Sequence, residues 1–223
     1  MTSTCTICNQ YVFHSQKNFW AKSYGEKYGH KSDIIRETAH FLAIAGIGAL
    51  TKGYVLLFPK QHITSIGALP EYLFSELRRE NRIIREALLD LYGSAVFFEH
   101  GTSSSCNYGS CIEHAHFHAL PSAIDFRRFL SEFTETPIQD ISELEEYRDN
   151  GYLYYENTEE AKFVYTTSIP IGSQYFRRIW ARTVGKADEW HWQVFIGEEN
   201  VACTINDLRN VLSMRVNGDN EKD

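Results

Sequence analysis

Three histidines recur at every second position between Gly109 and Pro121: His114, His116 and His118. Small or apolar residues separate them: Ala115, Phe117 and Ala119. Successive side chains of a β-strand point to opposite faces, so on a strand the three imidazoles would share one face. The Gly- and Ser-rich segment 101–111 comes directly before them, and its backbone N–H groups suit an anionic ligand. The pattern therefore predicts either metal binding or chemistry at phosphorus.

Cys5 and Cys8 form a CxxC pair near the N-terminus. A four-coordinate structural zinc site needs two more ligands, and the later histidines can supply them; two incidental thiols are the alternative. Cys106 and Cys111 stay open as further ligands. The 5 cysteines of the chain fit thiols or metal ligands in a cytoplasmic protein better than disulfides.

The length and composition of the chain restrict the class of protein. At 223 residues, one large or two small domains are expected, and 13 Tyr, 14 Phe and 4 Trp predict a packed core. A net charge of -7 argues against binding of duplex nucleic acid through a basic surface. Residues 1–10 lack the pattern of a signal peptide, and the longest apolar run, 41–50, is too short to cross a membrane. We expect a soluble, cytoplasmic protein with no membrane partner.

Periodicity predicts a mixed series of elements. Residues 9–33 are expected to form a loop, and residues 36–58 an antiparallel hairpin around a Lys-Gly turn. The clearest helix is 70–92, ended by Gly93. Further strands are predicted at 95–99, 152–155, 163–169 and 190–196, and further helices at 126–133, 173–184 (capped by Ser173) and 205–214. The best candidate for a domain boundary is the acidic region 122–150.

With these residues in order, the sequence resembles the histidine-triad (HIT) family. The motif is His114-Ala-His116-Phe-His118-Ala-Leu. A CxxC pair, a Lys-Gly turn, a strand ending in Pro-Lys-x-His, a helix, a strand and a Gly-containing loop precede it in the family's order. The resemblance covers residues 5–121. It implies an α+β fold, with a HIT-like catalytic domain (1–121) built on an antiparallel sheet with flanking helices, and an α/β C-terminal extension (122–223) packed on it.

The resemblance implies a nucleotide-conjugate hydrolase or nucleotidyl transferase. His116 would attack the α-phosphorus of a phosphoanhydride or phosphoramidate and form a covalent nucleotidyl-histidine. His118 would bond to the phosphate or the leaving group, and His114 would brace the strand. Neutral imidazole is nucleophilic near pH 7, and a backbone carbonyl that holds the Nδ1 proton would leave Nε2 free to attack.

Phosphate oxygens would be bound by the loop and by a pair of arginines. The candidate loop residues are Gly109, Ser110 and Cys111, through their amides. Arg177 and Arg178 suit phosphate because guanidinium binds it bidentately, although ordinary surface residues are the equal alternative.

Some bacterial members of the family hold a zinc ion. Its ligands, carried over to this sequence, are Cys5, Cys8, His62 and His114. Two cysteines and two histidines make a closed structural site. The alternative is a catalytic metal held by all three triad histidines.

Three positions depart from the family pattern. Residues 45–49 lack the carboxylate that binds the ribose hydroxyls, Glu99 and His100 stand near the usual Asn, and Gly109-Ser110 replaces Gly-Gln. The nucleophile is retained while the nucleotide-recognition residues are not. A non-catalytic nucleotide- or phosphate-binding protein with a structural zinc is therefore the alternative. Either a monomer or a homodimer fits the sequence.

Overall fold

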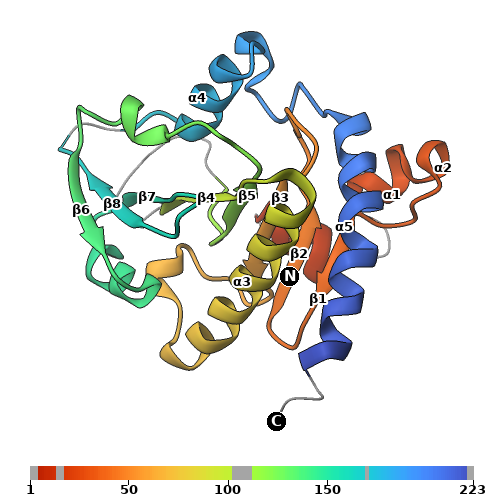
Figure 1. Cartoon of the computed structure of the whole chain (residues 1–223), viewed down its shortest axis with the longest axis horizontal. Helices are drawn as coiled ribbons and strands as arrows, with labels where there is room; N and C mark the ends of the chain where they lie inside the picture. The colour runs from red at the N-terminus through yellow and green to blue at the C-terminus, as the bar shows by residue number, and fades with distance from the viewer. Residues whose placement is uncertain (1–4, 14–17, 102–111, 169–170, 220–223) are drawn as a thin grey trace.

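The fold, seen in a computed structural model, is built on one antiparallel sheet whose strands differ in length (Figure 1). The structure describes residues 5–13, 18–101, 112–168 and 171–219, with side chains up to residue 212. Eight strands occur in the order β1-β2-β3-β5-β4-β7-β8-β6, and every neighbouring pair is antiparallel. Helices flank this sheet, so the predicted α+β class is confirmed.

The strands come from both halves of the chain. They are β1 Ile34–Glu37, β2 Phe41–Ala45, β3 Val55–Pro59, β4 Val96–Gly101, β5 Phe117–Leu120, β6 Thr134–Ile138, β7 Tyr152–Glu156 and β8 Lys162–Thr166. Strand β4 pairs with β5 on one side and with β7 on the other. A single sheet therefore crosses the expected boundary at residue 121, and the division into 1–121 and 122–223 stays a prediction.

The helices lie around the sheet and at its end. They are α1 Phe19–Ser23, α2 Gly25–Tyr28, α3 Phe74–Tyr92, α4 Tyr175–Thr183 and α5 Glu198–Asp219. Short helical turns are η1 Cys8–Val12, η3 Ile66–Ala68, η4 Glu71–Leu73, η5 Phe126–Phe129, η6 Ile141–Tyr147 and η7 Ala187–Glu189. Within the described part of the chain, no helix combines the length and the apolar character needed to cross a membrane.

Helix α3 packs its apolar stripe on one face of the sheet. Leu77, Ile84 and Leu88 are fully buried, as their spacing along the helix predicts. Gly93 ends the helix in the left-handed conformation (φ 77°), which costs glycine little because it has no Cβ. The predicted start at residue 70 is four residues early, because 71–73 form a 3₁₀ turn.

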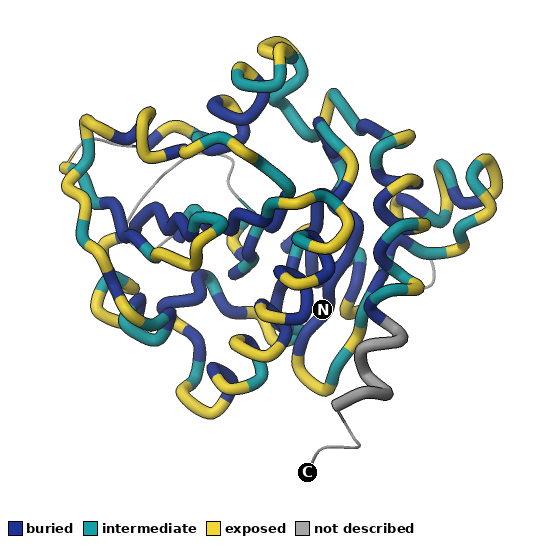
Figure 2. Tube along the Cα trace, viewed as in Figure 1, coloured by how far each residue is buried: buried dark blue, intermediate teal, exposed yellow. Residues whose placement is uncertain are grey.

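The middle of the molecule is buried (Figure 2), and strand β2 is buried along its whole length. Phe41 and Ala43 of β2 belong to the core cluster that contains the α3 residues. Leu42 and Ile44 point the other way, into a second cluster with Cys5, Cys8 and Tyr11 of the N-terminal segment. Alternation along β2 thus gives the sheet a second apolar face, and the N-terminal segment covers it.

Several predicted elements are corrected by the structure. The supposed loop 9–33 contains α1 and α2, and β5 begins only at Phe117. Gln174, in a left-handed conformation, stands in the N-cap position before α4 without a side-chain cap bond, so the predicted Ser173 cap is wrong.

Residues 190–196 form turns and no strand. Their backbone groups bond elsewhere: Trp190 O accepts from Arg177, and Ile196 O accepts from Gly48 N. The last helix begins at Glu198, seven residues before the predicted start, and its Asn200 and Thr204 side chains bond to the 49–53 turn.

Candidate active site

His116 is held with one ring nitrogen free for chemistry. Its Nδ1 lies 2.6 Å from the carbonyl oxygen of His114. A carbonyl can only accept, so Nδ1 carries the proton, and in the neutral ring Nε2 keeps its lone pair. Burial lowers the pKa of His116, which favours the neutral form at pH 7. The ring therefore has the tautomer and the charge state of a nucleophile.

His118 is positioned by a tyrosine that sequence reasoning missed. Its Nδ1 lies 2.6 Å from the hydroxyl oxygen of Tyr54, at the start of the hairpin's second strand. The ring stacks on Phe98 with a centroid separation of 4.5 Å, and burial lowers the pKa of His118 well below its usual value. Burial also raises the pKa of Tyr54, so the phenol keeps its proton. The buried Tyr54 hydroxyl thus fixes the orientation of the His118 ring, the third ring of the triad.

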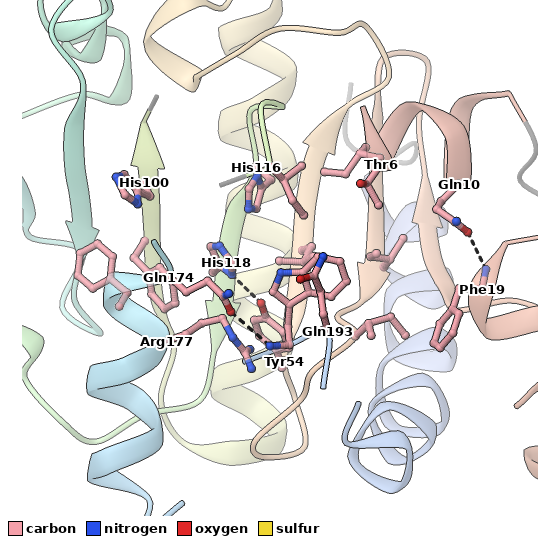
Figure 3. Close-up of a pocket in the computed structure, with 18 of the residues that line it drawn as sticks. Thr6, Gln10, Phe19, Tyr54, His100, His116, His118, Gln174, Arg177 and Gln193 are labelled. Carbon is pink, nitrogen blue, oxygen red and sulfur yellow. Dashed lines mark hydrogen bonds between the residues drawn. The ribbon is translucent and has the colours of Figure 1, made fainter. Parts of the chain in front are cut away.

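Both histidines line a cavity of about 360 Å³. In Figure 3 they point into the same space, with His100, Gln174 and Arg177 on one side and Thr6, Gln10 and Phe19 on the other. A cavity of this size falls in the range that holds small-molecule ligands. The predicted triad is therefore split: His116 and His118 face the cavity, and His114 does not line it.

Arg177 brings a buried positive charge to this cavity from helix α4. Only 3% of the residue is exposed. Nε donates to Trp190 O and Nη2 donates to Gly48 O, each at 2.9 Å. The Nη1 atom of Arg177 is buried and has no hydrogen-bond partner among the described residues. No carboxylate in the described part of the chain forms an ion pair with Arg177. A buried cation without a counter-charge is costly, so the site is suited to an anionic ligand.

The other predicted phosphate-binding residues lie away from the cavity or fall outside the described residues. Arg178 is exposed and its guanidinium carbon lies 4.0 Å from the centroid of the Trp190 ring, outside the cavity lining. Gly109, Ser110 and Cys111 lie outside the described residues. The two arginines therefore differ, although the sequence treats them as a pair, because adjacent positions on a helix face different directions.

A metal-ligand cluster is formed by four side chains that include the first triad histidine: Cys5, Cys8, His62 and His114. Their four ligand atoms all lie within 4.8 Å of one another. His114 Nδ1 is 3.4 Å from Cys5 Sγ, 3.5 Å from Cys8 Sγ and 3.4 Å from His62 Nδ1. A tetrahedral ion with bonds of about 2.3 Å to sulfur and about 2.05 Å to nitrogen separates S and N by about 3.6 Å and two N atoms by about 3.4 Å. The cluster thus has the dimensions to hold a metal ion.

The second nitrogen of His114 supports this arrangement. Nε2 lies 2.7 Å from the carbonyl oxygen of Pro59 and must donate to it, which leaves the lone pair on Nδ1 toward the cysteines. Burial lowers the pKa of His114 to about 4, so the ring is neutral, as a metal ligand must be. No group formed by the three triad histidines is found among the residues for which side chains are described.

The positions that depart from the family pattern are occupied by other contacts. A Cβ at Gly46 would lie 2.4 Å from Cε1 of Tyr54, so the ring that holds His118 fills this space. Glu99 is buried and points away from the cavity. On that far side of the sheet its carboxylate accepts hydrogen bonds from Ile66 N and from the Tyr152 hydroxyl. His100 does line the cavity, and burial, followed by the charge of His116, lowers its pKa to about 4.

Comparison with known proteins gives matches at the level of structure only. No family model matches this sequence, and no curated protein does either. Solved structures that resemble part of it include a hypothetical histidine triad nucleotide-binding protein from Sulfolobus tokodaii, at 22% identity and TM-score 0.36 over 42% of this chain and 62% of that one. The chain thus spans less than two thirds of the Sulfolobus protein.

Two other solved structures cover more of this chain. A hypothetical protein from Leishmania major is 20% identical, with a TM-score of 0.39 over 56% of this chain and 77% of that one. A HIT family hydrolase from Clostridium thermocellum is 20% identical, with a TM-score of 0.35 over 55% and 94%. Histidine-triad proteins recur among these structures, the family that the motif resembles. All three TM-scores are below 0.5, so the roles proposed next depend on the geometry of the site.

Proposed function

We propose that the protein is a nucleotide-conjugate hydrolase or nucleotidyl transferase that acts at the α-phosphate through His116. The observation that carries the proposal is the hydrogen bond from His116 Nδ1 to the His114 carbonyl, which leaves Nε2 as a lone-pair nitrogen in the cavity. His118 and Arg177 face the same cavity and supply a hydrogen-bonding ring and a positive charge.

The reaction has two displacements at phosphorus. The Nε2 lone pair of His116 forms the P–N bond, and the bond from phosphorus to the leaving group breaks with its electron pair. The Tyr54 hydroxyl lies within hydrogen-bond distance of Nδ1 of His118. In the proposed reaction Tyr54 donates to Nδ1, so that His118 carries its proton on Nε2 and donates it to the phosphate or to the leaving group. Water, or the hydroxyl of a second acceptor, then forms the new bond to phosphorus and releases its proton to the solvent. The P–N bond breaks with its electron pair on Nε2, which leaves as neutral imidazole.

Arg177 binds the non-bridging phosphate oxygens in this proposal. Its buried Nη1 lacks a partner among the described residues, and an anionic oxygen supplies one. Charge-assisted hydrogen bonds of this kind strengthen as negative charge develops in the transition state. The corresponding roles of Gly109, Ser110 and Cys111 stay predictions, as does that of Arg178, whose exposed position favours a surface role.

We also propose that the metal-ligand cluster holds a structural zinc ion. Cys5, Cys8, His62 and His114 would hold the ion, and two thiolates with two imidazoles would leave no position for water. The ion would then brace the fold by tying the N-terminal segment to the backbone just before His116, and would take no part in the displacement.

The alternative is a protein that binds a nucleotide or phosphate without turnover. The absence of a carboxylate from the described cavity lining favours it, because a ribose would lack its usual partner. The two functions are separated by turnover of a panel of phosphoramidates, dinucleoside polyphosphates and nucleotide sugars by the wild type and by His116→Ala. We expect turnover that falls at least about 1000-fold in the variant, the scale on which loss of a nucleophile acts in other covalent enzymes. Binding without turnover in the wild type would establish the alternative.

A further inference from the structure

The chemical character of the cavity wall indicates what kind of substrate fits beside the reacting phosphorus. Apolar and aromatic side chains dominate it, from the N-terminal segment, from β2 and β3, and from α4; examples are Tyr11, Ile44, Leu56, Phe98 and Phe176. The charged group among the described lining residues is Arg177, and no Asp or Glu belongs to that lining. The described wall thus offers mainly apolar surface, one cation and no carboxylate. Its neutral polar side chains include Gln10 and Gln174, whose Oε1 atoms already accept from Phe19 N and Trp192 N.

Two positions of the turn where a ribose-binding carboxylate would stand, Gly46 and Gly48, have no room for a side chain. The Tyr54 ring fills the place of a Cβ at Gly46. Gly48 has a φ of 84°, and a Cβ there would lie 2.7 Å from Cβ of Trp192 and 3.1 Å from Nη2 of Arg177. Neither Gly46 nor Gly48 can therefore carry a side-chain acceptor without displacing Tyr54 or Trp192, and Ile47 between them lines the cavity with an apolar side chain.

Acidic residues near the cavity do not belong to its lining. Glu113, next to the lining residue Ile112, is exposed and lies outside the lining, and Glu99 and Asp33 are bonded elsewhere. Glu99 stands between Phe98 and His100, and alternation along β4 sends it to the opposite face, where Tyr152 donates to it. Asp33 lies behind Tyr11 and accepts from the Tyr11 hydroxyl at 2.7 Å and from the Asn18 amide at 2.6 Å. The sequences of 1–4, 14–17, 102–111 and 169–170 contain neither Asp nor Glu.

From these observations we infer that the cavity accepts phosphate conjugates whose group next to phosphorus is uncharged and largely apolar, and that it does not select for ribose hydroxyls. This inference rests on the proposed displacement at phosphorus by His116, and it extends the substrates from nucleotide conjugates to phosphate conjugates without a sugar. Recognition by apolar contact discriminates weakly against a missing hydroxyl, whereas a site built to bond that hydroxyl rejects the analogue by several orders of magnitude. Arg177 supplies the attraction for the phosphate that every such conjugate shares.

A matched series of chromogenic diesters tests the inference on the full-length protein. The compounds are uridine 5′-(4-nitrophenyl phosphate), its 2′,3′-dideoxy counterpart and phenyl 4-nitrophenyl phosphate, which has no sugar. We expect kcat/KM for the ribose and dideoxy compounds to agree within about fivefold, and the sugar-free diester to be turned over within about tenfold of them. A preference of about 100-fold or more for the ribose compound would overturn the inference and leave the proposed function standing.

Binding separates the inference from the proposed function if none of the diesters is turned over. Calorimetry then compares uridine 5′-monophosphate, its 2′,3′-dideoxy counterpart and phenyl phosphate. Dissociation constants that agree within about fivefold would support the inference while the proposed catalytic role failed. Binding of the ribose compound alone, or of none of the three, would refute it.

Discussion

Replacing Cys8 with serine tests the metal-ligand cluster with a change of one atom. Cys8 Sγ lies 3.5 Å from Nδ1 of both His62 and His114, the separation that a shared tetrahedral ion imposes. Serine is a poor zinc ligand, and three ligands bind far more weakly than four. We therefore expect about one zinc ion per chain in the wild type and none in Cys8→Ser.

The effect on stability follows from linkage between metal binding and folding. An ion present at about 100 times its dissociation constant stabilises the folded state by about 2.7 kcal/mol. For a chain of this size each kcal/mol shifts Tm by about 2–4 °C, so a strong chelator is expected to lower the wild-type Tm by about 5–10 °C. The same chelator should leave the Tm of Cys8→Ser unchanged, because that variant has no ion to lose.

Cys203→Ser is the matched control. Cys203 is an exposed thiol on α5, outside the metal-ligand cluster, and the substitution exchanges the same pair of atoms. This variant should keep its zinc and its chelator-dependent Tm. Metal content is read by mass spectrometry of the native protein, and Tm by calorimetry with and without chelator. The reasoning would be refuted by Cys8→Ser that retains stoichiometric zinc, which would favour the triad histidines as ligands.

Three further predictions concern the cavity and a buried acid. Arg177→Gln should lower kcat/KM for anionic substrates about 100-fold, the scale on which loss of one transition-state donor acts. The control Arg182→Gln, at an exposed position on the same helix, should change kcat/KM less than twofold. Equal effects of the two substitutions in steady-state kinetics would argue against phosphate binding by Arg177. Tyr54→Phe leaves Nδ1 of His118 without its buried partner, and urea denaturation should show a loss of about 1–3 kcal/mol, with kcat falling more than KM rises; an unchanged kcat would remove the positioning role. Burial raises the pKa of Glu99 to about 8, whereas the unfolded chain releases this proton near pH 4–5. Between these two pKa values only the folded chain keeps the proton, so the free energy of unfolding falls as pH rises, by up to about 1.4 kcal/mol per pH unit. Glu99→Gln should flatten this slope in denaturation curves at pH 5, 6 and 7, and an equally steep slope in the variant would place the titration elsewhere.

Much of the framework could be predicted from the sequence because local patterns decide it. The apolar stripe of α3, the glycine that ends it and the hairpin around the Lys-Gly turn are all encoded by spacing and turn chemistry. The same holds for the metal-ligand cluster, whose four members were expected from the resemblance and lie together in the structure.

The remaining features depend on contacts between distant segments. Tyr54 reads as a core strand residue, and its bond to His118 follows only from the pairing of β3 with β5. Arg177 and Arg178 look equivalent in the sequence, but the packing of α4 buries one and exposes the other. Residues 190–196 have the composition of a strand, yet Arg177 and Gly48 take up their backbone groups, so a strand does not form.

The central claim is that Nε2 of His116 forms a covalent bond to phosphorus, and rapid-quench mass spectrometry tests it most directly. The wild type is mixed with a nucleotide conjugate that it turns over, quenched within milliseconds to seconds, and digested for peptide mapping. We expect the mass of one nucleotidyl group on the peptide that contains His116, and no adduct in His116→Ala of unchanged metal content. An adduct on another residue, or turnover that persists in His116→Ala, would contradict the account.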